Sequence, residues 1–358
     1  RDSSTSRGLG DVYKRQKVAS PDSEFLGQVG AIVTGFSRME AAYGSGDGDE
    51  GATAAVASKS NAEVGTIFEQ IYRPWNGTLN SRWIRNWSIL RHHIYGMFSK
   101  GHRPWGWPVR ISLLVLLLGS LNDLFLSFLG NATGVEELSR LFSPSRENLY
   151  AHVLGFFPRN VFCFPIAAAL LVGGMISEDR KNGTSAIYFS RPVNRTDYTV
   201  MKFISVAVLL SILIVGTLAA YYVGDLVLSG EGWAYVLDTF PLFFAASIAG
   251  LFLVFTYSSI GLALSSISRG KFFPAISLLG IILGTKFIAF LISQLYNDSI
   301  VYLLSPYDCI AHLGQSMMGI TSTYDHPYTW SLVSIITMNA ISLYVLTARV
   351  SSMEVTRE

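Results

Sequence analysis

The residues best suited to chemistry form a dense polar segment, Met175 to Lys202, between two long apolar runs. It reads MISEDRKNGTSAIYFSRPVNRTDYTVMK, and it combines acidic, basic, hydroxyl and phenol groups. Charged and hydroxyl side chains at this density suit recognition through ion pairs and hydrogen bonds. Since so polar a segment cannot lie in hydrocarbon, we expect it in water against a membrane face, where a soluble partner can reach it.

Glycine and proline divide this segment into three pieces. A helical extension over Ser177 to Lys181 meets Asn182-Gly183, a common helix stop. Thr184 is placed to cap a short helix over Ser185 to Phe189, and Arg191-Pro192 ends it, because the residue before proline is disfavoured in helical geometry. A short helix held between two tight breaks suits docking of a partner.

Three ionisable residues interrupt otherwise apolar runs: Asp123, Lys286 and Arg159. Counted at about 1.5 Å per residue from the start of their runs, Asp123 and Lys286 lie at a shared depth of roughly 20 Å. A charge within a membrane costs at least ~2.5 kcal/mol, so each needs an opposite charge or water. We predict that Asp123 and Lys286 pair or line one polar patch, with Arg159 close to it. The alternative is that each side chain extends to the headgroups.

Other chemistries have little support in the sequence. A phosphate-binding loop requires GxxxxGK followed by Ser or Thr, but Gly270-Lys271 is followed by Phe272, so ATP hydrolysis is not expected of this chain. His92-His93 point to different helix faces, and His312 and His326 read as members of a polar loop, so no metal site is predicted. Two cysteines and a net charge of +2 favour neither a disulfide scaffold nor nucleic-acid binding.

The elements that must position these residues are membrane spans. Half of the residues are hydrophobic and only 15% are charged, against roughly 25% in soluble domains. A span needs ~20 mostly apolar residues. Six segments qualify: 109–129, 153–176, 201–223, 242–267, 273–295 and 330–347. The predicted fold is an all-α integral membrane protein with six transmembrane helices.

The distribution of Lys and Arg predicts the orientation. They gather before the first span and after the second, fourth and sixth, whereas the loops 224–241 and 296–329 contain none. By the positive-inside rule, both termini and the polar segment are cytoplasmic.

The remaining segments lie outside the spans. Residues 11–16, DVYKRQ, match the translation of a sequencing adapter, so residues 1–16 are predicted to be an artefact, and 17–61 a disordered linker or a cytoplasmic segment of unknown role. Ser81 to Lys100 carries Trp, Ile and Phe at helical spacing opposite Arg and His, which is typical of an interfacial amphipathic helix. The apolar loop 302–323 predicts short re-entrant or surface helices.

The polar segment resembles the signature of type-2 ABC transporter permeases. The matching residues are Glu178, Asp179, Gly183, Thr184, Ser190, Arg191, Pro192, Val193, Arg195, Tyr198 and Lys202. Tyr72 to Gly77 and Trp83 to Arg85 resemble the amphipathic helix that precedes the first span in that family. The resemblance covers roughly residues 61–358, including the six-span layout.

The resemblance implies an exporter subunit that works as a homodimer or heterodimer with separate ATP-hydrolysing subunits, in the plasma membrane. ATP and Mg²⁺ would bind those partners, and this chain would hold no cofactor. The coupling helix would be Thr184 to Phe189. The implied coupling-loop residues are Glu178, Asp179, Arg180, Gly183, Thr184, Tyr188, Arg191, Pro192, Arg195, Tyr198 and Lys202.

Within that loop, Glu178, Asp179 and Arg180 would meet the ATPase, and Arg191 and Arg195 its acidic surface or anionic lipid. A polar turn that only keeps two spans in register is the alternative reading of the loop. For the whole chain, the alternatives are an ion-driven secondary transporter and a membrane scaffold or regulatory protein without transport.

Overall fold

The computed structural model describes residues 80–98, 106–135, 137, 141–143, 145–155, 159–189, 193–229 and 232–353. All of them belong to one compact unit, Thr78–Glu358. The predictions for residues 1–16 and 17–61 lie outside the described residues, as do Ser190, Arg191 and Pro192. The described residues form helices and no strand.

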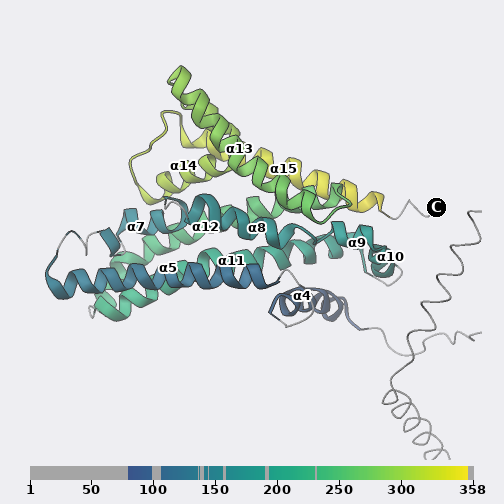
Figure 1. Cartoon of the computed structure of the whole chain (residues 1–358), viewed down its shortest axis with the longest axis horizontal. Coiled ribbons are helices and arrows are strands. Elements are labelled where there is room, and N and C mark those ends of the chain that lie inside the picture. The colour runs from purple at the N-terminus through teal and green to yellow at the C-terminus, as the bar shows by residue number, and fades with distance from the viewer. Residues whose placement is uncertain are drawn as a thin grey trace, which may run out of the picture. The chain divides into compact units, whose positions relative to one another are not determined.

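Six helices are long and apolar enough to cross a membrane, as the sequence predicts. Their spans are Val109–Thr133, Val161–Lys181, Arg195–Leu228, Trp233–Ile267, Phe272–Tyr296 and Tyr328–Ser352. Five of these spans correspond to single helices: α5 (Gly106–Thr133), α11 (Arg195–Ser229), α12 (Trp233–Ile267), α13 (Phe272–Tyr296) and α15 (Tyr328–Ser352). The second span contains α8 (Phe164–Val172) as its central part. Figure 1 shows them as a bundle of elongated helices.

The second span differs from the predicted continuous helix over 153–176. Wide π-type turns, Ala151–Gly155 (η1) and Arg159–Cys163 (η2), precede α8, and the chain turns again at Gly173 to Ile176 before α9 (Ser177–Lys181). Pro165 lies in the first turn of α8, where the missing amide hydrogen is tolerated. The apolar run therefore correctly predicts a span but not its breaks, which fall at Gly155 and at Gly173-Gly174.

The core is built around α12, which packs against α8, α11, α13, α14 (Pro306–Met318) and α15. Many of the buried residues of α12 are small, including Ala249, Gly250 and Ser258. A Cβ added at Gly261 would lie 2.8 Å from the Val172 side chain. Small residues allow close helix contact in membranes, where interhelical hydrogen bonds also help. Asn339 of α15 makes such bonds, donating to Thr256 Oγ1 at 3.0 Å and accepting from Ser259.

Two short helices connect α13 with α15, as the apolar loop predicts: η3 (Ile300–Leu304) and α14. Ser305 caps α14 by accepting from the Asp308 amide, Pro306 occupies its first turn, and Gly319 ends it at φ 66°. These signals lie in the local sequence and require no tertiary contact.

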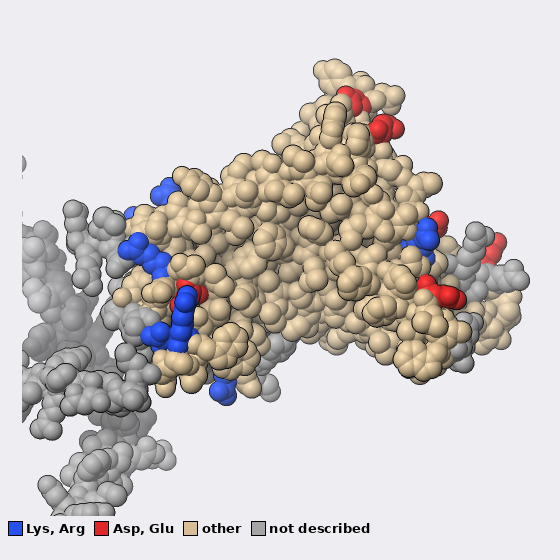
Figure 2. Space-filling view, turned by 180° about the vertical axis from the view of Figure 1, so that it is seen from behind, with Lys and Arg blue, Asp and Glu red and all other residues tan. Residues whose placement is uncertain are grey.

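The opposite ends of the bundle differ in charge. The end with α4 (Arg82–Phe98), α9 and α10 (Thr184–Phe189) holds most of the Lys and Arg side chains visible in Figure 2. The other end, with α7 (Arg146–Tyr150) and α14, shows acidic groups. The described basic residues near this end, on helices that begin or end there or in the turn between α12 and α13, are Arg82, Arg85, Arg91, Arg110, Arg180, Lys181, Arg195, Lys202, Arg269, Lys271 and Arg349.

Candidate functional site

The polar segment forms a helical elbow, defined here as α9 and α10 with the turn between them. Gly183 adopts φ 68°, a left-handed conformation that favours glycine and ends α9 as predicted. The first amides of α9 are satisfied from another helix, because Ser265 Oγ of α12 accepts from the backbone N–H groups of Ile176 at 3.1 Å and Ser177 at 3.2 Å. A side chain distant in sequence therefore fixes where the elbow begins.

Asp179 is the centre of the elbow's hydrogen-bond network. Its Oδ2 lies 2.7 Å from Lys202 Nζ and accepts from the Tyr198 hydroxyl at 2.7 Å. Its Oδ1 accepts from Thr184 Oγ1 at 3.0 Å. Thr184 thus donates to the preceding helix instead of capping α10, and α10 begins at Thr184 itself. The network joins α9 and α10 to the first turns of α11.

Lys202 is the most deeply buried charge of the segment. Its side chain is 0% exposed, and Nζ donates to the Met175 carbonyl at 2.9 Å. The rings of Tyr188 and Tyr198 lie 5.8 and 5.3 Å from Nζ, within the range of cation–π attraction. The expectation that the whole segment lies in water is therefore wrong at this end, because α11 begins at Arg195 and carries Lys202 into the core.

The neighbouring charges of α9 fasten the elbow to two other spans. Glu178 Oε1 lies 2.9 Å from Lys271 Nζ, just before α13. Arg180 Nη1 donates to the carbonyls of Ser266 and Ile267, at 2.6 and 3.1 Å, at the C-terminus of α12. A guanidinium is favoured there by the helix dipole and by the unpaired carbonyls.

Glu178, Asp179 and Arg180 have partners within this chain, to which their charged groups bind. The ATPase contact that the resemblance implies for them stays a prediction. Among the elbow residues whose side chains the structure describes, Lys181 to Gly183 in the turn are exposed, as is Arg195 at the start of α11. Tyr188 is half-buried, with its ring 5.4 Å from that of Tyr198.

A second connection joins α4 to the same region. Arg82 Nε and Nη2 donate to the two carboxylate oxygens of Asp197 at 2.8 and 2.6 Å, a bidentate pair. Asp197 holds the pKa of Arg82 above its usual value. Within the stretch Ser81 to Lys100, residues Arg82–Phe98 form α4, which packs on α11 and α5 with Trp83 and Trp87 exposed; its placement at a membrane interface stays a prediction.

The charges within the spans have other partners than predicted. Lys286 Nζ lies 2.8 Å from Asp308 Oδ1, so the predicted pairing of Lys286 with Asp123 is wrong. Asp123 instead lines a small cavity with His152 and Tyr221. The backbone of Arg159 begins η2, while its side chain lies outside the described part of the structure. Asp308 belongs to a loop helix outside the apolar runs, so the sequence gives no sign that it meets a charge within a span.

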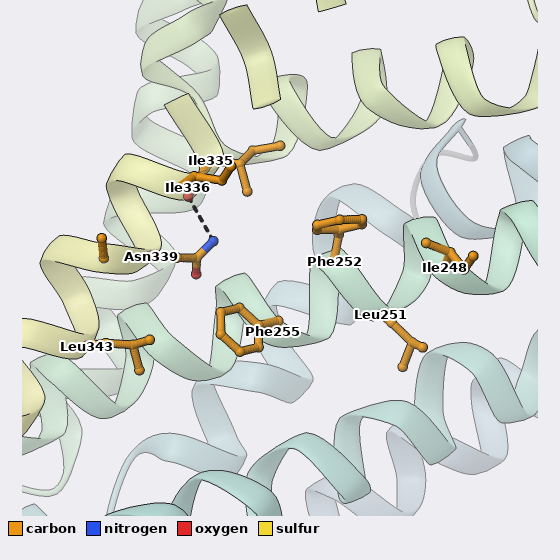
Figure 3. A pocket seen from close by; sticks show the side chains of 9 residues that line it. Ile248, Leu251, Phe252, Phe255, Ile335, Ile336, Asn339 and Leu343 are labelled. Atoms are coloured by element: carbon orange, nitrogen blue, oxygen red, sulfur yellow. Dashed lines mark hydrogen bonds between the residues drawn. The ribbon is translucent and has the colours of Figure 1, made fainter. Parts of the chain in front are cut away.

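A groove on the side of the bundle lies between α12 and α15 (Figure 3). Its volume is about 500 Å³, and apolar side chains line it except for Asn339. Asn339 also donates to the Ile335 carbonyl at 2.9 Å, the bond drawn in Figure 3. The described residues contain no group of three or more His, Cys, Asp or Glu side chains arranged to hold a metal.

Comparison with known proteins agrees with this geometry. The model of the ABC-2 family transporter proteins matches residues 31–350. The chain belongs to the ABC-2 transporter family. No curated protein matches it significantly. As an ABC-2 permease it is a multi-pass membrane subunit for transport, of a family that is in general non-catalytic and pairs with an ABC ATPase subunit. The match also includes residues 31–61, assigned from sequence to a linker.

Membership of the ABC-2 family removes the support for an ion-driven secondary transporter and for a scaffold without transport.

The residues that sequence reasoning missed are the internal partners of the elbow: Ser265, Lys271, and the carbonyls of Ser266 and Ile267. The only signal for them was Lys271 itself, which was counted as part of the positive-inside pattern. Their spatial role depends on how α8, α12 and α13 meet.

Proposed function

We propose that this chain is the permease of an exporter, and that the elbow transmits movement of a separate ATPase to the spans. The observation that carries the proposal is that each charged residue from Glu178 to Arg180 connects the elbow to a different span. Asp179 binds Lys202 of α11, Arg180 binds the end of α12, and Glu178 binds Lys271 before α13.

Such connections would allow one displacement of the elbow to reach several spans together. The connection between Asp179 and Lys202 is buried, and ion pairs in low dielectric are stronger than those in water. The exposed turn from Lys181 to Gly183 is then the surface that the ATPase would contact. ATP and Mg²⁺ would bind the ATPase, and this chain would need no cofactor.

The basic end of the bundle supports a cytoplasmic elbow. Lys and Arg gather where α4, α9, α10 and the end of α15 lie, and cytoplasmic flanks of spans are enriched in these residues. We therefore propose that both termini are cytoplasmic and that the host bilayer is the plasma membrane. Dimerisation with a second permease, identical or related, completes the proposed exporter.

Co-purification tests this proposal. Membranes of the host that contain the tagged chain are solubilised, and the ABC ATPase that the tagged chain retains is identified and measured by mass spectrometry. Scrambling Thr184 to Phe189 should remove the ATPase, while the variant Ile336→Ala, in the distant α12–α15 groove, should retain it. Labelling of a cysteine introduced at Asn182 should occur from the cytoplasmic side. Retention of the ATPase by the scrambled chain, or external labelling at Asn182, would refute the coupling role.

A further inference from the structure

A second cavity, of about 560 Å³, lies between α13, η2, η3, α14 and the residues that follow α14. Its volume is within the range of small-molecule sites, roughly 300–1,000 Å³. One wall is apolar and aromatic, with Phe162, Leu283, Phe287 and Phe290. The other wall is polar and includes Lys286, Asp308, Thr323 and Tyr324.

Asp308 in the polar wall has an unused acceptor. Its side chain is 3% exposed, and its Oδ1 accepts from Lys286 Nζ at 2.8 Å and from the Tyr324 hydroxyl at 3.1 Å. Its Oδ2 is buried and has no hydrogen-bond partner among the described residues. A carboxylate has about four acceptor positions, and a buried one left empty costs free energy. Because carboxyl torsions are broad, a small rotation would present Oδ2 to a donor in the cavity.

The charge of the polar wall limits which kind of molecule can supply a donor to Asp308. Lys286 and Asp308 together are neutral, and Lys286 Nζ lies 4.2 Å from the centre of the Tyr307 ring. A cationic head would leave one net positive charge at membrane depth, and an anionic head would face the carboxylate; both are costly. A neutral head with a hydroxyl donor satisfies Oδ2 without adding a charge.

The apolar wall indicates where this molecule comes from. Phe287 is 62% exposed and Phe290 is 50% exposed on α13, a helix whose length and composition suit a membrane span. Since these rings face outward from the bundle beside the cavity, a hydrocarbon chain can reach the site laterally from the bilayer. We propose that this cavity binds a neutral, hydroxyl-bearing membrane lipid, with its hydroxyl on Asp308 and its chain along Phe287 and Phe290.

The site is tested by photolabelling of the purified full chain in phosphatidylcholine nanodiscs, without ATPase or ATP. The probe is a monoacylglycerol with a diazirine in its acyl chain. Two matched probes carry the same chain: the dimethyl ether of that monoacylglycerol, which lacks donors, and the lysophosphatidic acid. Mass spectrometry then locates and quantifies the labelled peptides. We expect the monoacylglycerol to label Phe162 and the α13 segment from Leu283 to Phe290 about tenfold more than either matched probe.

Variants make the test specific to this cavity. Leu283→Trp fills the apolar wall without touching the ion pair and should abolish the labelling. The control Ile336→Trp places the same ring in the α12–α15 groove and should leave it unchanged. Asp308→Asn should remove the preference for the hydroxyl probe; where that variant fails to fold, Leu283→Trp decides.

Three results would overturn the proposal. Equal labelling by the hydroxyl and ether probes would mean that Asp308 does not select the head and that water satisfies Oδ2. Unchanged labelling in Leu283→Trp would place the lipid elsewhere. Cross-linking between chains in place of lipid labelling would mean that a second copy covers this face. None of these results bears on ATPase coupling.

Discussion

The ion pair between Asp179 and Lys202 yields an asymmetric stability prediction. Lys202 is 0% exposed, whereas the Asp179 side chain is 18% exposed and keeps hydrogen bonds from Tyr198 and Thr184. Asp179→Asn leaves a buried ammonium without its counter-ion, so it should lower the free energy of unfolding by about 3–5 kcal/mol. Lys202→Met leaves a partly solvated carboxylate, so it should cost less, about 2–3 kcal/mol.

The double variant Asp179→Asn/Lys202→Met removes both charges. In the double variant the Met175 carbonyl loses its hydrogen bond from Lys202 Nζ, 2.9 Å away. This loss should lower the free energy of unfolding by roughly 1–2 kcal/mol. The double variant should therefore be more stable than Asp179→Asn alone. The assay is reversible unfolding in mixed detergent micelles, monitored by tryptophan fluorescence. The idea of a buried and mutually dependent pair would be refuted by either of two results. One is a loss of unfolding free energy in the double variant equal to the sum of the two single losses, and the other is equal losses in the two single variants.

Three further predictions concern other parts of the chain. Arg180→Gln should release α9 from the end of α12 and raise hydrogen exchange over Ser177 to Phe189 by about tenfold, with exchange in α14 as the unchanged control. Burial lowers the pKa of His312 and of His326 from 6.5; His326 opposes protonation of His312, whereas Asp298 and Asp325 favour that of His326. Both pKa values are lowered on folding, so the unfolded chain binds protons more readily than the folded chain. The contribution of the two neutral histidines to the free energy of unfolding should therefore be fully present above about pH 6.5 and be lost with further acidification. Thermal melting should show this slope, and His312→Gln/His326→Gln should flatten it; an unchanged slope would contradict it. Burial raises the pKa of Cys309 to about 11, so maleimide at about pH 7.5 should label Cys163 well before Cys309 in the folded chain, and both after unfolding.

The sequence predicts the spans well because their signal is local. Six apolar runs, the Gly183 helix stop and the cap of α14 at Ser305 depend on residues adjacent in sequence. The same local signals predict α9, α10 and α4 to within a few residues. The breaks in the second span coincide with Gly155, Pro158 and Gly173-Gly174, which are local signals too, but the apolar count alone does not register them.

The charges show where local reasoning ends. The sequence predicts a pair between Lys286 and Asp123 because both interrupt spans at one depth, but depth does not specify which helix faces meet. Its true partner, Asp308, lies on a helix that folds back against α13. Likewise, Glu178 and Arg180 read as polar surface until α12 and α13 are placed beside them.

The sequence by itself determined that the chain crosses a membrane six times, with a charged elbow between the second and third spans. Hydrophobic length and charge content set this, because hydrocarbon admits apolar helices and excludes polar segments whatever their neighbours. Only the tertiary structure decided that the elbow's charges turn inward, onto α11, α12 and α13. An ion pair needs two groups within a few ångströms, and that proximity arises from helix packing.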